Sequence, residues 1–372
     1  MNIKVAKSDI AEVLSKVQGL TGRRSSLAIT ENVLIRTTGE GVALIATDLE
    51  TGFEGSYPAT VKKEGVIAIT ARKFFEIVRE FPSAEIQITE VENRWIEIGN
   101  KSVQYHIVGM NPEDYPDSPQ LEDVSFFEID SAAFKKMIEK TVMVGGTIDD
   151  KRAHINGVFF ELLATEDRKA LRMVSTDGSR LATVDYDLPE DMDVALKDGM
   201  IIPKKGLHEV SKFLEAEGTV QIGFKDNHFV VKKDSETIII RLLEGEFPQY
   251  KEIITKSEGH SIIIDKDKFT KMLKRMSILT SENYKGAIFA FGENNLVITA
   301  TNPDIGESKE EMAIEYNGNL IEVAFNPKYF IEILNVIDSA NVVLFMASDE
   351  KPCFIEGENE SNFLSVIMPM RI

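Results

Sequence analysis

The chain has a single cysteine, Cys353, among its 372 residues, so no disulfide can form within it. It also lacks any apolar run near the roughly 18 residues that a membrane-spanning helix needs, and its first residues lack the apolar stretch of a signal peptide. Proline and glycine, at 12 and 24 residues, are too scarce for a collagen-like or low-complexity chain. These absences predict a cytoplasmic protein of packed globular domains with no membrane partner.

Basic residues are in short supply as well. The 42 Lys and Arg residues face 61 Asp and Glu, which gives a formal net charge of -19. Composition alone therefore argues against a nucleic-acid partner, because phosphate contacts depend on Lys and Arg. At roughly 100 to 200 residues per domain, the length predicts two or three domains, each able to bury a core.

The sequence does contain one unit that occurs three times. Similar segments follow β-rich runs at Thr47, Thr176 and Thr301, which lie 129 and 125 residues apart. Two further families of segments, both at the start of helix-like stretches, recur at similar spacing, and all three spacings are close to a third of the chain. We therefore predict three repeated domains over residues 1–124, 125–256 and 257–372.

Each unit shows the order helix, strands, helix, strands. The segments 33–36, 41–45, 85–88 and 95–98 are short and β-branched, with Gly or Asn turns around them, which indicates antiparallel strands. Brief apolar stripes at helical spacing, such as Phe269, Met272, Leu273 and Met276, indicate amphipathic helices. The predicted fold class is α+β.

The polar faces of the predicted helices are basic, unlike the chain as a whole. Residues 72–79, 134–140 and 204–212 each carry a net charge of +2, and residues 268–275 carry +4. Arg72 and Arg79, and likewise Lys136 and Lys140, are spaced to share one helical face. If equivalent helices of the repeats face the same way, one surface is basic and the rest acidic, which suits a protein that holds a polyanion without reading its sequence.

Candidate catalytic groups are scattered along the chain. No histidine pair has metal-ligand spacing and no glycine-rich phosphate loop follows a strand, so we expect no metal, no cofactor and no catalysis. A metal-dependent phosphodiesterase and a monomeric adaptor remain as alternatives. The acids that a phosphodiesterase would use to hold Mg²⁺, which are also typical turn residues, are Asp48, Asp149, Asp150 and Asp177.

Four segments resemble the bacterial DNA polymerase III beta subunit family, the sliding clamps. They are Thr-Asp-Gly-Ser-Arg-Leu-Ala at 176–182, Glu-Gly-Glu-Phe-Pro-Gln-Tyr at 244–250, Phe-Asn-Pro-Lys-Tyr at 325–329 and Val-Ile-Met-Pro-Met-Arg-Ile at 366–372. The resemblance runs from end to end. It implies three DNA-clamp domains, each with two helices packed on antiparallel sheets, and two subunits that close head to tail into a ring.

The resemblance also implies a function, partners and site residues. Such a ring encircles duplex DNA without sequence specificity, and it tethers the replicative polymerase, the clamp loader and repair proteins through short linear motifs. The DNA-facing residues would be Arg24, Arg72, Lys73, His154 and Lys205. The partner-peptide pocket would comprise Arg152, Ile155, Thr176, Gly178, Ser179, Leu181, Pro248, Ile253, Asn326, Tyr329, Val366, Met368, Pro369, Met370 and Arg371. The homodimer interface would involve Tyr105, Ile107, Ile278 and Leu279.

Overall fold

A computed structural model describes residues 1–22, 27–119, 122–145, 152–165, 168–192, 194, 196, 199–281 and 284–371 of the protein. The chain forms two compact units. Unit 1 comprises Met1–Lys135, Met192–Leu196 and Ile202–Leu242, and unit 2 comprises Lys136–Asp191, Lys197–Ile201 and Leu243–Ile372. No helix within the described ranges is long and apolar enough to cross a membrane.

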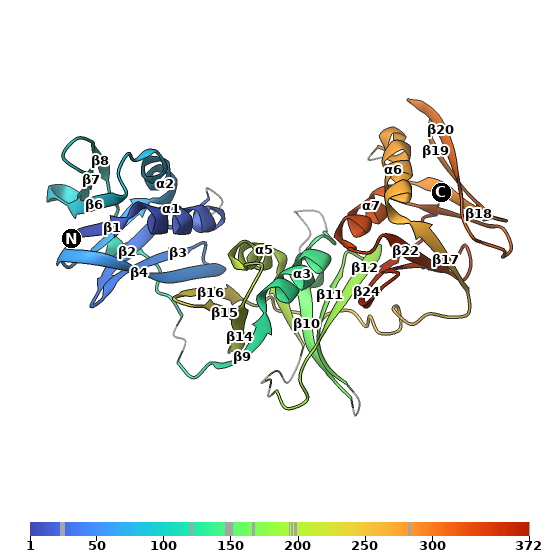
Figure 1. Ribbon diagram of the computed structural model, residues 1–372, viewed down its shortest axis with the longest axis horizontal. Coiled ribbons are helices and arrows are strands. Elements are labelled where there is room, and N and C mark those ends of the chain that lie inside the picture. Colours follow the sequence, from blue (N-terminus) through green and yellow to red (C-terminus); the bar gives the residue numbers. More distant parts are fainter. Residues whose placement is uncertain are drawn as a thin grey trace. The chain divides into compact units, whose positions relative to one another are not determined.

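Unit 1 is built on one 12-stranded antiparallel sheet, whose main path runs β8-β7-β6-β1-β4-β16-β15-β14-β9, with β2, β3 and β5 paired off this path. Helices α1 and α2 pack side by side on it (Figure 1). The bounds are β1 (Asn2–Ala6), α1 (Lys7–Lys16), β2 (Asn32–Thr38), β3 (Gly41–Thr47), β4 (Thr51–Lys63), β5 (Val66–Thr70), α2 (Ala71–Glu80), β6 (Glu85–Glu90), β7 (Trp95–Gly99), β8 (Gln104–Val108), β9 (Ser125–Asp130), α5 (Lys204–Phe213), β14 (Thr219–Lys225), β15 (His228–Lys233) and β16 (Glu236–Arg241).

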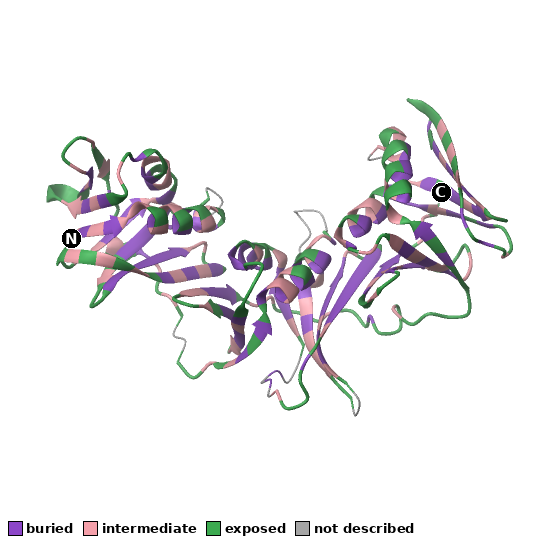
Figure 2. Ribbon diagram, viewed as in Figure 1, coloured by how far each residue is buried: buried purple, intermediate pink, exposed green. Residues whose placement is uncertain are grey.

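Apolar periodicity explains how these elements pack. Strand β1 alternates between buried and half-buried positions, which matches the period of two in a strand with one buried face. Helix α2 buries Phe74 and Val78 and leaves Arg72, Lys73 and Arg79 exposed. Figure 2 shows the same division along the helices, with buried residues toward the sheet and exposed residues on the outer side.

The first and second repeats share the sheet of unit 1. Strand β4 pairs with β16 of the second repeat, with Phe53 opposite Ile238, so the main-chain ladder is continuous from one repeat to the next. Tyr115, near the end of the first repeat, donates its hydroxyl to the carbonyl oxygens of Asn32 and Ile45 at 3.1 and 3.3 Å. Continuous pairing removes the exposed edges that separate sheets would leave.

Unit 2 contains an 8-stranded sheet in the order β13-β10-β11-β12-β24-β23-β22-β17 and a 4-stranded sheet in the order β20-β19-β18-β21. Helix α3 and strand β13 span the division between the units. The bounds are α3 (Ser131–Val142), α4 (Ala153–Asn156), β10 (Gly157–Ala164), β11 (Lys169–Thr176), β12 (Arg180–Asp187), β13 (Met200–Pro203), β17 (His260–Asp265), α6 (Lys266–Met276), β18 (Ala287–Gly292), β19 (Asn295–Asn302), β20 (Gly306–Ala313), β21 (Ile321–Phe325), α7 (Pro327–Val336), β22 (Asn341–Met346), β23 (Cys353–Gly357) and β24 (Glu360–Ile367).

Strands β12 and β24 join the second and third repeats within unit 2 as β4 and β16 do in unit 1. Helices α6 and α7 pack together, and the rings of Phe269 and Phe330 meet edge to face with centroids 5.9 Å apart. The α+β class and the repeated arrangement of helices and strands are confirmed. The boundaries predicted for three domains stay a prediction, because the compact units divide the middle repeat between them.

Candidate functional site

A tight turn between β11 and β12 forms one wall of the main pocket of unit 2. Thr176 Oγ1 donates to the carbonyl of Arg180 at 2.8 Å and accepts the Gly178 amide at 3.1 Å. Asp177 Oδ1 accepts the amides of Ser179 and Arg180 at 2.9 and 3.0 Å. Gly178 has a φ of +89°, which glycine adopts without the steric cost that other residues meet. Short polar side chains thus fix the turn from within.

Arg180 is 5% exposed and has its charge compensated inside the protein. Its guanidinium forms ion pairs with Asp177 at 2.9 Å and Glu332 at 2.5 Å, and its Cζ lies 4.3 Å from the centre of the Tyr329 ring. This combination of pairing and stacking is what a planar guanidinium favours when buried. Arg180 therefore holds the turn against α7 and contributes a rigid wall.

The second wall is the segment that follows Pro248. Tyr250 lies at its centre, and its hydroxyl donates to a carboxylate oxygen of Glu161. Burial raises the pKa of Tyr250, and the bond to Glu161 raises that pKa further, so the hydroxyl remains a donor at neutral pH. Arg172 beside it is held by two bonds to Asp185, at 2.7 and 2.8 Å. The segment is anchored to the sheet beneath it.

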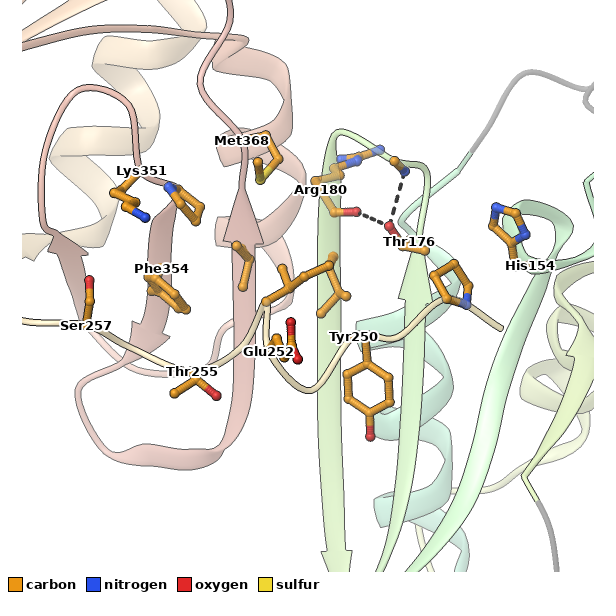
Figure 3. Close-up of a pocket in the computed structure, with 16 residues that line it drawn as sticks. His154, Thr176, Arg180, Tyr250, Glu252, Thr255, Ser257, Lys351, Phe354 and Met368 are labelled. Carbon is orange, nitrogen blue, oxygen red and sulfur yellow. Dashed lines mark hydrogen bonds between the residues drawn. The ribbon is translucent and has the colours of Figure 1, made fainter. Parts of the chain in front are cut away.

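Strands β23 and β24 provide the third wall. Phe354 and Val366 are buried in one apolar cluster with Leu181 and Tyr250. Met368 continues from β24, and its amide donates to the carbonyl of Ser179 at 2.9 Å. The three walls enclose about 440 Å³ (Figure 3). The lining residues are His154, Thr176, Gly178, Arg180, Leu181, Pro248, Tyr250, Glu252, Ile253, Thr255, Ser257, Lys351, Pro352, Phe354, Val366 and Met368.

Some of the residues predicted for the pocket line it and others lie around it. Those on the lining are Thr176, Gly178, Leu181, Pro248, Ile253, Val366 and Met368. Asn326 caps α7 by accepting the Lys328 amide, and Arg152 precedes α4, in which Ile155 is buried. Pro369 follows Met368 outside the lining. Met370 and Arg371 line a separate hollow of about 210 Å³ with Tyr284 and Lys285.

Sequence reasoning did not include several wall residues in the pocket. Arg180 and Tyr250 belong to the segments that carry the family resemblance, so their position offered a signal. Lys351, Pro352 and Phe354 offered none, because only the pairing of β23 with β24 brings them to the site. His154, predicted to face DNA, lies on the pocket wall, with its ring 6.5 Å from that of Phe247.

The predicted DNA-facing residues outside the pocket are exposed in unit 1, except Arg24, which lies outside the described residues. Arg72 and Lys73 reach Glu76 one turn along α2, at 3.3 and 2.8 Å. Lys205 Nζ contacts Asp48 at 2.5 Å. The two pairs with Glu76 are at the protein surface, where such contacts contribute little and open readily, whereas the Asp48 side chain that holds Lys205 is only 7% exposed.

One expectation about the basic faces is wrong. Lys136 and Lys140 do not both face solvent, because Lys140 is buried and pairs with Glu360 at 2.7 Å. Its ammonium also lies 5.0 Å from the centre of the Phe363 ring. Strand β24 covers this part of α3. On α6, Lys268, Lys271 and Lys274 are exposed, whereas Arg275 Nε donates to Glu310 at 2.8 Å.

The residues predicted for the dimer interface lie at sheet ends. Tyr105 and Ile107 are on β8, which ends the strand order of unit 1. Ile278, 72% exposed, and the half-buried Leu279 follow α6, beside β20 at the end of the 4-stranded sheet. Among the described residues, no group of His, Cys, Asp or Glu is arranged to hold a metal ion. Asp149 and Asp150 lie outside those residues.

Three domain families match the chain in succession. They are the N-terminal, central and C-terminal domains of the DNA polymerase III beta subunit, over residues 1–119, 128–249 and 251–371. The beta sliding clamp of Chlamydia pneumoniae is 28% identical over 372 residues, which covers all of this chain and 99% of that protein.

Solved structures agree with this match along the whole chain. A sliding clamp from Bartonella birtlesii, determined with bound griselimycin, is 27% identical and superposes with a TM-score of 0.93. The DNA polymerase III subunit beta of Pseudomonas aeruginosa is 26% identical, with a TM-score of 0.92. In both comparisons the alignment covers 100% of each chain.

Proposed function

This chain belongs to the DNA polymerase III beta subunit family, the sliding clamps, and from that premise we propose that it encircles duplex DNA and tethers a replicative polymerase. It acts as a processivity factor without catalysing a reaction itself. Replication in bacteria places it in the cytoplasm. The observation that carries the proposal is the end-to-end match of all three repeats, because a ring needs every one of them.

Ring closure requires a second copy of the chain. Strands β8 and β20 end their sheets, and pairing β8 of one copy with β20 of the other would continue both sheets across the boundary. Tyr105 and Val108 on β8 are exposed, as is Ile278 beside β20. A head-to-tail dimer would bury these apolar side chains at both junctions.

The basic helix faces are proposed to meet the DNA. Arg72 and Lys73 are exposed and pair with the surface residue Glu76, which phosphates can replace. Lys205 is also exposed, but it pairs with Asp48, whose side chain is 7% exposed. Arg24 and His154 complete the proposed set by resemblance alone. Such contacts carry no sequence information, so they permit sliding, and the closed ring rather than affinity prevents dissociation.

The pocket of unit 2 is proposed to bind short linear motifs of the polymerase, the clamp loader and repair proteins. Its centre is apolar and its walls are fixed by internal hydrogen bonds, so apolar anchors of a disordered segment can enter a preformed site. Met368 adds a flexible thioether that adapts to different anchors.

Solution mass and DNA retention together test the proposal. A dimer has a mass of about 83 kDa, twice the 41.6 kDa of the chain, and it should remain on nicked circular DNA after loading but run off when that DNA is linearised. A monomer that binds both DNA forms equally would contradict the clamp and favour an adaptor. Mg²⁺-dependent cleavage of either DNA would instead favour a phosphodiesterase.

A further inference from the structure

The pocket of unit 2 carries two charged side chains that the protein itself does not neutralise. Arg180 is paired with Asp177 and Glu332, as described above. Glu252 and Lys351 also line the pocket, both are exposed, and within the described part of the chain neither forms an ion pair. They are therefore the charges that a bound segment meets first.

Two lysines close to Glu252 in the sequence have acidic partners, unlike Glu252 itself. Lys251, next to Glu252, lies 3.6 Å from Glu161. Lys256, a few residues further on, lies 2.6 Å from Glu356 and also stands over the Phe345 ring. Both of these lysines are outside the lining and have acidic partners, whereas Glu252 and Lys351 lie on the lining without an ion-pair partner among the described residues. The exposed acids Glu258, Asp349 and Glu350 are outside the lining.

The two charges come from different walls. Glu252 is on the segment that follows Pro248, in a turn fixed by the Ile253 amide donating to the Tyr250 carbonyl at 2.9 Å. Lys351 is on the loop between β22 and β23, directly before Pro352. Figure 3 shows Lys351 on the side of the third repeat, with Phe354 beneath it, and Glu252 on the linking segment.

We propose that Glu252 and Lys351 select the charges that flank the apolar anchors of a bound segment. A basic side chain next to the anchors would pair with Glu252, and an acidic group on the other side of the anchors would pair with Lys351. Because the two charges are opposite and lie on different walls, they also distinguish the two directions in which a segment could lie. This inference rests on the proposed function of the pocket and specifies its partner as a segment with one basic and one acidic flank.

The expected selectivity is modest. Each attraction or repulsion between exposed charges changes affinity by a little under two-fold, roughly, and the wrong order of charges replaces two attractions with two repulsions. We therefore expect a preference of about ten-fold between the two orders. It should shrink at high salt, because both groups are exposed to solvent.

Three synthetic peptides of equal length test the inference on the full-length protein. All share the same leucine and phenylalanine anchors. One has Lys before and Glu after the anchors, one has the reverse order, and one has Gln at both places. The wild-type protein should bind the two charged peptides with affinities that differ about ten-fold, and the double variant Glu252→Lys/Lys351→Glu, which keeps the net charge, should reverse the preference.

A matched control separates local pairing from the overall field of the protein. Glu258→Lys changes the charge by the same amount as Glu252→Lys, on an exposed residue of the same segment outside the lining, and it should leave the preference intact. If the wild-type protein bound both charged peptides equally and also bound the Gln peptide, Glu252 and Lys351 would not select flanking charges, but the pocket would still be the binding site for the anchors. If none of the three peptides bound, the proposed function of the pocket would itself be wrong.

Discussion

Leu49 and Gly178 occupy the same position of the same turn in successive repeats. Both have a left-handed backbone, with φ of +79° and +89°. The Leu49 amide donates to Thr47 Oγ1 at 3.0 Å, as the Gly178 amide donates to Thr176 Oγ1 at 3.1 Å. The repeat therefore preserves the turn even where the residue is not glycine.

The two turns differ in the side chain at this position and in the size of the hollow beside it. Gly178 borders the pocket of about 440 Å³, whereas Leu49, 44% exposed, borders a hollow of about 110 Å³ in unit 1. A Cβ added at Gly178 would meet no atom within 4 Å. Glycine thus leaves open the space beside the second turn, and the substitution to leucine is structurally possible there, as Leu49 shows.

We predict that Gly178→Ala and Gly178→Leu have similar effects on stability and different effects on binding. Each should lower the free energy of unfolding by about 1 kcal/mol, because both place a residue with a β-carbon in the left-handed backbone conformation. Only the leucine should fill the pocket, so anchor-peptide affinity should fall at least ten-fold in Gly178→Leu and less than three-fold in Gly178→Ala. Urea unfolding and peptide titration measure the two effects, and an unchanged affinity in Gly178→Leu would place the peptide elsewhere.

The dimer interface can be tested at Ile278 and Leu279. Replacing both with Asp would bury unpaired carboxylates between the copies, so we expect monomers by light scattering at micromolar concentration. Leu320→Asp is the control, since Leu320 is equally exposed but precedes β21, at the opposite end of the 4-stranded sheet. A dimer mass in the double variant would rule out this interface.

Charge reversal tests the proposed DNA-facing side. Changing Arg24, Arg72, Lys73 and Lys205 to Glu should weaken DNA retention and lower the magnitude of the salt dependence by about one unit per lost phosphate contact. Lys205 should contribute least, because Asp48 competes for its ammonium. A variant that reverses Lys62, Lys63, Lys101 and Lys225, none of which is on a helix, changes the charge equally. Equal salt slopes in both variants would contradict the assignment.

The buried pair of Lys140 and Glu360 predicts a pH-dependent stability. Burial alone would raise the pKa of Glu360, but hydrogen bonds from Lys140 and the Ser339 amide lower it overall. A lowered folded-state pKa contributes stability that is present above the unfolded value of about 4.3 and is lost as pH falls through the folded value. Glu360→Gln should cost about 3 kcal/mol at pH 7, and this difference should narrow below about pH 4. If the difference in the free energy of unfolding between wild type and Glu360→Gln stayed constant from pH 7 to 3, the negative charge of Glu360 would not contribute to stability.

The same pair shows where sequence reasoning reached its limit. Helical spacing correctly predicted that Lys136 is exposed to solvent and that Phe269, Met272 and Leu273 are buried. The period of the apolar residues indicates which face of a helix packs on its own sheet. Helical spacing failed for Lys140, whose environment is set by β24, more than 200 residues later in the chain. Contacts of this kind depend on tertiary pairing that no local pattern carries.

The pocket residues likewise fall into those that local sequence could predict and those that it could not. Thr176, Gly178 and Pro248 could be assigned because they belong to short segments that resemble the family. Lys351 and Phe354 could not be assigned to the pocket from the sequence. They reach it only because β23 pairs with β24, and no local pattern indicates that pairing. The merging of β4 with β16 was likewise not predicted, because a strand pattern does not name its partner.

The final prediction concerns the end of the chain. Deleting residues 368–372 should abolish polymerase stimulation and leave a closed ring, because Met368 lines the pocket while the proposed interface strands lie elsewhere. The deletion also removes the bond from the Met370 amide to the Ala324 carbonyl at 2.8 Å, so a milder variant is needed. Met368→Ala keeps that bond and removes only the side chain at the pocket, which should weaken anchor-peptide binding about ten-fold. Peptide titration against wild type, Met368→Ala and the truncation, with ring mass measured in parallel, decides the matter: equal affinity in all three would exclude this segment from the partner site.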